Sequence, residues 1–226
     1  MNNWLLLHGA LGSKEQMKPL LKIFTGAKKV FAIDILGHGE KGANVDFSFQ
    51  AFAEDIVLFL EKEGIQEISI FGHSMGGYLA LYLARHYPER VIRVITYGTK
   101  FEWNPKVSQI QIDAIEPEIL IKKSPAFVEI LKKRHSANNW ETVVKKSRQL
   151  LKAIGENQPL SDVDFSMIGQ PTDILLGSLD RLVTKYESIK VAQLLHRGKV
   201  SVLQCMGHSL HSININQLAP YFNDYL

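Results

Sequence analysis

Three residues in this chain have the types that nucleophilic catalysis needs. Ser74 is the centre of the run G-H-S-M-G, Asp180 lies in G-S-L-D-R-L-V, and His208 follows a glycine in C-M-G-H-S. A serine hydroxyl is a poor nucleophile until a base takes its proton, and a histidine oriented by an aspartate is suited to that task. The three residues therefore predict attack by Ser74 on an acyl carbonyl.

The surroundings of Ser74 predict a sharp turn from a strand into a helix. The run before it, I-S-I-F, is β-branched and aromatic, and the run after it, Y-L-A-L-Y-L-A, has a helical pattern that Pro88 stops. Glycines two positions before and two after Ser74 permit the backbone angles of a tight turn. The unpaired N–H of Met75, at the start of the helix, would face an oxyanion formed at Ser74.

Five stretches make the chain resemble the α/β-hydrolase superfamily over essentially its whole length. They are H-G-A at 8–10, D-I-L-G-H-G at 34–39, G-H-S-M-G at 72–76, G-S-L-D-R-L-V at 177–183 and G-H at 207–208. The resemblance implies a triad of Ser74 as nucleophile, Asp180 as acid and His208 as base. It also implies an oxyanion hole formed by the backbone N–H groups of Ala10 and Met75. No cofactor and no metal are expected.

Small members of this superfamily carry out several reactions, so the activity is open at this point. The chain looks like a bacterial carboxylesterase that cleaves a small or medium ester through an acyl-Ser74 intermediate. Thioesterases, and the synthase of menaquinone biosynthesis that abstracts a proton from an anionic substrate, use the same triad. A cationic pocket, for instance one that includes Arg134 or Arg148, would favour the synthase. A ligand-binding module without catalysis is the least favoured alternative, because every triad position is filled.

Three further histidines lie close to these motifs. His8 precedes the expected oxyanion loop, and the resemblance implies that it braces this loop. We expect His38 to pack near the pocket, since the triad is complete without it. His211 lies three residues after His208 and is expected in the following helix, so it is not the predicted base.

The pattern of apolar runs predicts an α/β fold that brings these loops together. Strands are expected at 4–7, 30–33, 68–71, 91–97, 171–176 and 200–203, alternating with helices at 14–24, 49–62, 78–87, 185–196 and 213–225. Such alternation is typical of a mostly parallel sheet of about six strands flanked by helices. The catalytic loops follow the carboxyl ends of strands, where ligands of such sheets bind.

The alternation of strand and helix patterns stops between residues 100 and 170, where short helical patterns are separated by prolines. We interpret this segment as a helical cap inserted into a core formed by 1–99 and 171–226. A cap supplies pocket walls and excludes water. The expected substrate-binding residues, from the cap and the two catalytic loops, are Leu11, His73, Trp103, Phe127, Leu131 and Trp140.

Composition narrows the class of protein further. The 226 residues fit one domain, and a net charge of +3 without a dominant basic tract does not favour nucleic acid as a partner. Cys205 is the single cysteine, so no internal disulfide forms, and we expect it to be buried. The start of the chain lacks the pattern of a signal peptide, and no apolar run reaches bilayer length. We expect a cytoplasmic enzyme with a small acyl substrate; the oligomeric state is not predicted.

Overall fold

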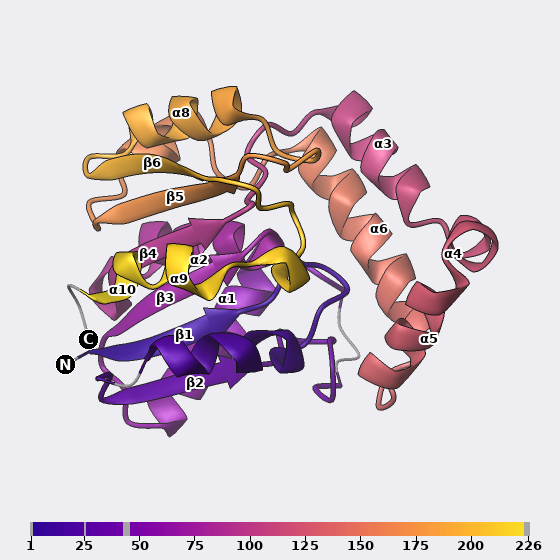
Figure 1. Cartoon of the computed structure of the whole chain (residues 1–226), viewed down its shortest axis with the longest axis horizontal. Helices are drawn as coiled ribbons and strands as arrows, with labels where there is room; N and C mark the ends of the chain where they lie inside the picture. Colours follow the sequence, from indigo (N-terminus) through magenta and orange to yellow (C-terminus); the bar gives the residue numbers. More distant parts are fainter. Residues whose placement is uncertain (1, 25, 43–45, 224–226) are drawn as a thin grey trace.

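The computed structural model describes residues 2–24, 26–42 and 46–223, and it contains a six-stranded sheet in the order β2-β1-β3-β4-β5-β6 (Figure 1). All neighbouring strands pair in parallel, which confirms the expected α/β-hydrolase architecture. The strands are β1 (Asn3–Leu7), β2 (Lys29–Ile33), β3 (Ile68–His73), β4 (Val91–Tyr97), β5 (Thr172–Gly177) and β6 (Gly198–Leu203).

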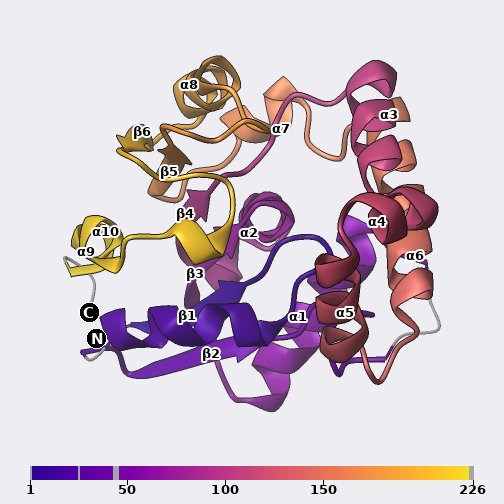
Figure 2. The same cartoon turned by 45° about the vertical axis from the view of Figure 1, so that its right-hand side comes forward.

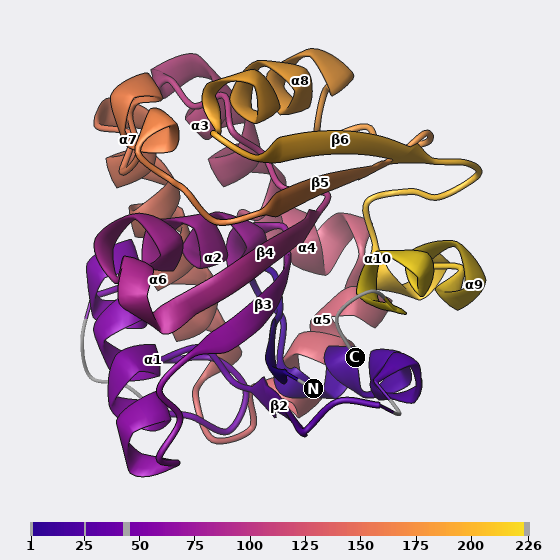
Figure 3. The ribbon, with the colours of Figure 1, turned by 90° about the vertical axis from the view of Figure 1, so that its left-hand side faces the viewer.

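Helices cover both faces of the sheet because alternate side chains of each strand point to opposite faces. In β1, Leu5 and Leu7 join one core cluster, whereas Trp4 and Leu6 join another. Figure 3 shows α1 (Phe49–Lys62) and α2 (Met75–His86) on one side of the sheet. On the other side lie the 3₁₀ helix η1 (Lys14–Ile23), α9 (Ile215–Leu218) and α10 (Pro220–Asn223). The helix α8 (Lys185–Leu194) packs on β5 and β6.

Five helices lie between β4 and β5 in the chain: α3 (Pro105–Ala114), α4 (Pro117–Lys123), α5 (Pro125–Arg134), α6 (Trp140–Glu156) and α7 (Asp162–Ser166). Local sequence explains their starts. Proline is the first residue of α3, α4 and α5. The N–H group at this position makes no hydrogen bond within a helix, so proline, which lacks it, is tolerated there. The side chains of Asn104 and Asn139 cap α3 and α6. Figures 1 and 2 show α3 to α6 together at one end of the molecule, beyond the ends of β1 and β3.

Two expectations about secondary structure and burial are wrong, whereas the helix expected at 14–24 forms as the 3₁₀ helix Lys14–Ile23, which contains Pro19. The segment 213–225, expected as one helix, is divided into α9 and α10 where Pro220 cannot donate a hydrogen bond, and its last two residues lie outside the described part. Cys205 is exposed rather than buried, in a turn where its φ is 58°.

None of the described helices has the length and apolar character needed to cross a membrane.

Candidate active site

Ser74 lies in a strained turn between the end of β3 and the start of α2. Its φ of 52° and ψ of −117° belong to a region that residues with a side chain rarely enter. Hydrogen bonds to both its N–H and its carbonyl group hold it there. The Ser74 N–H donates to the carbonyl of Tyr97 at 2.9 Å, and the Ser74 carbonyl accepts from Gly77 N at 3.0 Å and from Thr99 Oγ1 at 3.1 Å. The turn therefore fixes the direction of the hydroxyl.

Two glycines make this turn possible by allowing backbone segments to touch. A Cβ on Gly72 would lie 2.3 Å from the carbonyl oxygen of Gly76, and a Cβ on Gly76 would lie 2.4 Å from that of Leu7. Neither position has room for a side chain. The start of α2 thus packs directly against the end of β1, and the loop after β1 runs beside Ser74.

His208 connects Ser74 with Asp180 in one hydrogen-bonded row, so the structure brings the three predicted residues together. Its Nε2 lies 3.2 Å from Ser74 Oγ, and its Nδ1 lies 2.9 Å from Asp180 Oδ2. The other carboxylate oxygen accepts the N–H groups of Leu182 at 2.8 Å and Val183 at 3.1 Å. This arrangement directs Nδ1–H at the carboxylate and leaves the Nε2 lone pair for the serine proton.

The environment of Asp180 favours its ionised form. Burial of the carboxyl group acts to raise its pKa. The hydrogen bond and charge of His208, with the N–H groups of Leu182 and Val183, outweigh burial and leave the pKa of Asp180 below its ordinary value. At neutral pH a carboxylate therefore orients the imidazole.

Two residues at the ends of neighbouring strands fix the loop that carries His208. His73 Nε2 lies 2.8 Å from the carbonyl oxygen of His208 and donates to it, while the Tyr97 hydroxyl donates to the carbonyl of Gly207. Burial, and then the nearby His208, lower the pKa of His73 to about 4, so its ring is neutral at pH 7. Sequence reasoning missed Tyr97. The signal that the sequence offered was its position at the end of the strand expected at 91–97, and the structure pairs it with His73.

The predicted oxyanion loop passes close to Ser74. A Cβ on Gly9 would lie 3.2 Å from Ser74 Cβ, and Ala10 and Met75 both line the cavity above the serine. His8 Nε2 accepts the N–H of Ile35 at 3.0 Å, which ties this loop to the one after β2. Burial lowers the pKa of His8 to about 3, consistent with a neutral acceptor.

Helix α5 contacts the same loop from the opposite side. Arg134 Nη1 donates to the carbonyl of Leu11 at 2.6 Å, and His135 Nε2 lies 3.2 Å from that oxygen. Gly39 N–H donates to His135 Nδ1 at 2.9 Å, so Nδ1 is an acceptor and Nε2 carries the proton given to Leu11. His38 packs beside His135 and is fully buried. Sequence reasoning did not find this contact, which joins positions 123 residues apart.

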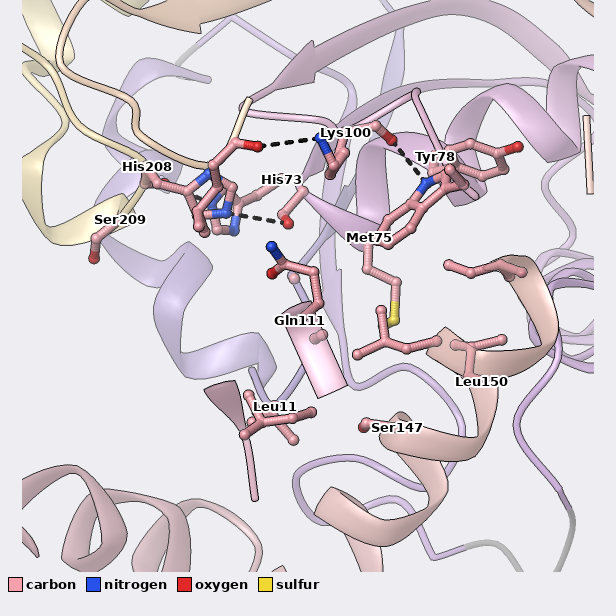
Figure 4. Close-up of a pocket in the computed structure, with 18 of the residues that line it drawn as sticks. Leu11, His73, Met75, Tyr78, Lys100, Gln111, Ser147, Leu150, His208 and Ser209 are labelled. Atoms are coloured by element: carbon pink, nitrogen blue, oxygen red, sulfur yellow. Dashed lines mark hydrogen bonds between the residues drawn. The ribbon is translucent and has the colours of Figure 1, made fainter. Parts of the chain in front are cut away.

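A cavity of about 320 Å³ lies between Ser74 and the helices α3, α5 and α6 (Figure 4). Of the expected substrate-binding residues, Leu11, His73, Trp103 and Phe127 line it. Sequence reasoning missed the other side chains from these helices that line it, which are Gln111, Ile115, Ser147, Leu150, Leu151 and Ile154.

Leu131 and Trp140, which were also expected to bind substrate, are not among the described residues that line this cavity. Both side chains pack in the larger core cluster, with exposures of 0% and 8%. Leu131 lies on the face of α5 turned toward the core, and Trp140 is the first residue of α6, beyond the part of that helix that reaches the cavity. They hold the helices in place.

Charged groups at the cavity are paired. Lys100 is the single lysine or arginine among the described lining residues, and its Nζ lies 3.3 Å from Glu187 Oε1. Glu187 is buried and also accepts the N–H groups of Phe101, Glu102 and Thr184. Within the described part of the chain, no group of three potential ligand side chains is placed to hold a metal ion.

Comparison with known proteins agrees with the observed fold. The profile of the family described as alpha/beta hydrolase fold matches residues 5–115. The first half of the chain therefore resembles this family in sequence, and the chain as a whole has the α/β-hydrolase fold. The match includes Ser74 and the predicted oxyanion loop. Asp180 and His208 lie outside it, so their placement rests on the hydrogen bonds described above.

Three relatives illustrate the range of the superfamily. Bifunctional epoxide hydrolase 2 of Sus scrofa is 36% identical over 103 residues, which cover 44% of this chain and 17% of that protein. The structure of MenH from S. aureus has a TM-score of 0.77 at 19% identity, with 100% of this chain and 93% of that one covered. A thermophilic esterase from Thermogutta terrifontis, with malate bound, has a TM-score of 0.78 at 19% identity, with coverage of 100% and 89%. The curated relatives are matched over 6% to 37% of their lengths.

Proposed function

We propose that this protein is a serine hydrolase that cleaves a carboxylic ester through an acyl-Ser74 intermediate. The observation that carries the proposal is the continuous row of hydrogen bonds from Asp180 through His208 to Ser74, at the wall of an apolar cavity. A hydroxyl, a base with a free lone pair and a buried carboxylate in this order are the groups that acyl transfer requires.

In the first step, Ser74 Oγ attacks the ester carbonyl while His208 Nε2 takes its proton. The backbone N–H groups of Ala10 and Met75 receive the developing oxyanion, and loss of one such donor typically costs about 2.7–4 kcal/mol of barrier. The imidazolium of His208 then protonates the departing alcohol, and the acyl group stays on Ser74. In the second step a water molecule, deprotonated by His208, releases the acid and restores the serine.

The charges around the cavity favour a neutral acyl group over the anionic substrate of a synthase. Lys100 is paired with Glu187, whereas Arg134 bonds the carbonyl of Leu11 and Arg148 pairs with Glu116. Each of these three cations is therefore already bonded to a carboxylate or carbonyl of the protein. The remaining wall is mostly aliphatic and aromatic, which suits a hydrocarbon chain. We propose that α3 to α6 act as a cap that keeps water from this chain.

The proposal is tested by hydrolysis of p-nitrophenyl esters of two to ten carbons by wild type and Ser74→Ala. We expect turnover by wild type, with a preferred medium chain length, and a loss of about 10⁴-fold or more in the variant. Residual activity near wild type in Ser74→Ala would contradict the role of this serine. Thioesters of the same acids distinguish an esterase from a thioesterase, because the cavity is the same and only the leaving group changes.

A further inference from the structure

The wall that α6 contributes to the cavity contains one polar residue in a row of apolar ones. Ser147, Leu150, Leu151 and Ile154 all line the cavity. Their spacing of three, four and seven positions places them on one face of the helix. A helix that packs by such a face normally has apolar side chains at every position of that face. A polar residue there therefore indicates a function.

The hydroxyl of Ser147 has no hydrogen-bond partner. The residue is 2% exposed, and its Oγ is fully buried without a donor or acceptor in reach. An unpaired buried hydroxyl typically costs about 1–3 kcal/mol. Ser108, on the facing helix α3, is also buried, but its hydroxyl is paired because it donates to the carbonyl of Leu151 at 2.7 Å. Ser147 thus places an unpaired hydroxyl in the wall of the cavity.

We propose that Ser147 recognises a neutral oxygen, carbonyl or hydroxyl, toward the far end of the substrate's acyl chain. This inference rests on the acyl-transfer role of Ser74 and specifies its substrate class. In Figure 4, Ser147 and His208 lie at opposite ends of the cavity, with Gln111 and Met75 drawn between them. The oxygen is therefore several bonds away from the scissile carbonyl, and a mostly apolar stretch separates the two.

The chemistry of the walls explains why the recognised group is neutral. A carboxylate buried beside Ser147 would need a cation, and Lys100 is already paired with Glu187. A keto or hydroxyl oxygen needs a single hydrogen-bond donor, which Ser147 supplies. Leu11, Trp103 and Phe127, which also line the cavity, offer contacts mainly to hydrocarbon, and Gln111 adds one neutral amide. The substrate class is a medium-chain ester with one oxygen function on its distal part.

The inference is tested with p-nitrophenyl heptanoate and its 4-oxo, 5-oxo and 6-oxo derivatives. We expect wild type to prefer one oxo ester over heptanoate by about 3- to 10-fold in kcat/KM, the effect of one net hydrogen bond. Ser147→Ala should abolish this preference, so that its kcat/KM values for heptanoate and for the oxo esters become equal. Ser108→Ala, a matched loss of a buried hydroxyl outside the cavity, should keep it. An unchanged preference in Ser147→Ala, or none in wild type, would overturn the inference.

A binding measurement separates this inference from the role of Ser74. Trp103 lines the cavity, so its fluorescence can report Kd for the same esters in Ser74→Ala and in Ser74→Ala with Ser147→Ala. Tighter binding of one oxo ester, lost in the double variant, supports recognition by Ser147 even if wild type fails to turn the esters over. Equal Kd values for heptanoate and all oxo esters in Ser74→Ala would refute it.

Discussion

The end of the cavity at Ser74 is held by hydrogen bonds, whereas the far wall is held by packing. At the first end, His208, Asp180, His73 and Tyr97 all use their polar atoms to fix one another or nearby loops. At the second, α3 and α6 pack through apolar side chains, and the Ser147 hydroxyl is left without a partner. Groups that perform chemistry need fixed directions, whereas groups that select a chain need a fixed volume.

After Ser74→Ala, the largest effect expected at the hydrogen-bonded end comes from Asp180→Asn. The amide cannot accept Nδ1–H as a carboxylate does, so His208 loses both its orientation and the charge that stabilises its protonated form. We expect kcat for a p-nitrophenyl ester to fall by about 10³- to 10⁴-fold. His211→Ala is the control, since His211 is exposed and should lose less than about threefold. The reverse ranking would mean that the acid and base are assigned wrongly.

Acid should weaken the fold around the catalytic loops and the start of the cap, because four buried histidines are neutral in these regions. Burial is the main cause that lowers the pKa of His8 to about 3, of His73 and His135 to about 4, and of His38 well below its ordinary value. The unfolded chain, with histidine pKa values near about 6.5, binds more protons between about pH 4 and 6.5. The unfolding free energy should therefore fall as pH drops through this window, by up to about 1.4 kcal/mol per pH unit for each group.

Urea unfolding at intervals from pH 8 to 5 measures this dependence. His135→Gln removes one of the four groups and should make the decline less steep, whereas His211→Ala should leave the slope unchanged. Stability that is constant from pH 7 to 5 would show that the four histidines do not remain neutral in the folded protein.

Two residues on α5 separate packing from substrate contact. Leu131→Ala removes a fully buried side chain from the core and should lower the unfolding free energy by about 2–5 kcal/mol without changing chain-length preference. Phe127→Ala, one turn earlier and on the cavity wall, should raise KM for medium-chain esters by about tenfold with a smaller loss of stability. Ile130→Ala, an exposed position on the same helix, should do neither. A changed chain-length preference in Leu131→Ala would reverse the placement of its side chain.

A smaller effect is expected where α5 holds the oxyanion loop. In His135→Gln the side-chain amide can still donate to the carbonyl of Leu11, whereas the shorter amide in His135→Asn can only replace the acceptor used by Gly39. If the bond to Leu11 positions the loop, kcat should be about 3- to 10-fold higher in His135→Gln than in His135→Asn, with similar KM. Equal kcat values, or a faster His135→Asn, would mean that the contact serves only to attach the helix.

The hydrogen-bonded end could be predicted from the sequence because its geometry is local. The run G-H-S-M-G contains the glycines that permit the left-handed turn at Ser74. Asp180 and His208 each follow a strand, and a parallel sheet brings the ends of its strands together. The break between α9 and α10 could also be predicted locally, because Pro220 interrupts the helical pattern of 213–225.

The far wall could not be predicted in the same way. Periodicity shows that Leu131 and Trp140 are apolar, but not whether they face the core or the cavity, since both environments exclude water. The contact of Arg134 and His135 with Leu11 depends on how α5 packs on the core, and no pattern near either position encodes it. Substrate choice is therefore harder to infer from sequence than reaction chemistry.

The most direct test of the account is the reaction of the protein with a fluorophosphonate, followed by intact-mass measurement and peptide mapping. We predict one adduct per wild-type chain, on the peptide that contains Ser74, and none on Ser74→Ala. Asp180→Asn should label much more slowly than wild type. A label on another residue, or equal labelling of wild type and Ser74→Ala, would contradict the claim that the row from Asp180 through His208 activates Ser74.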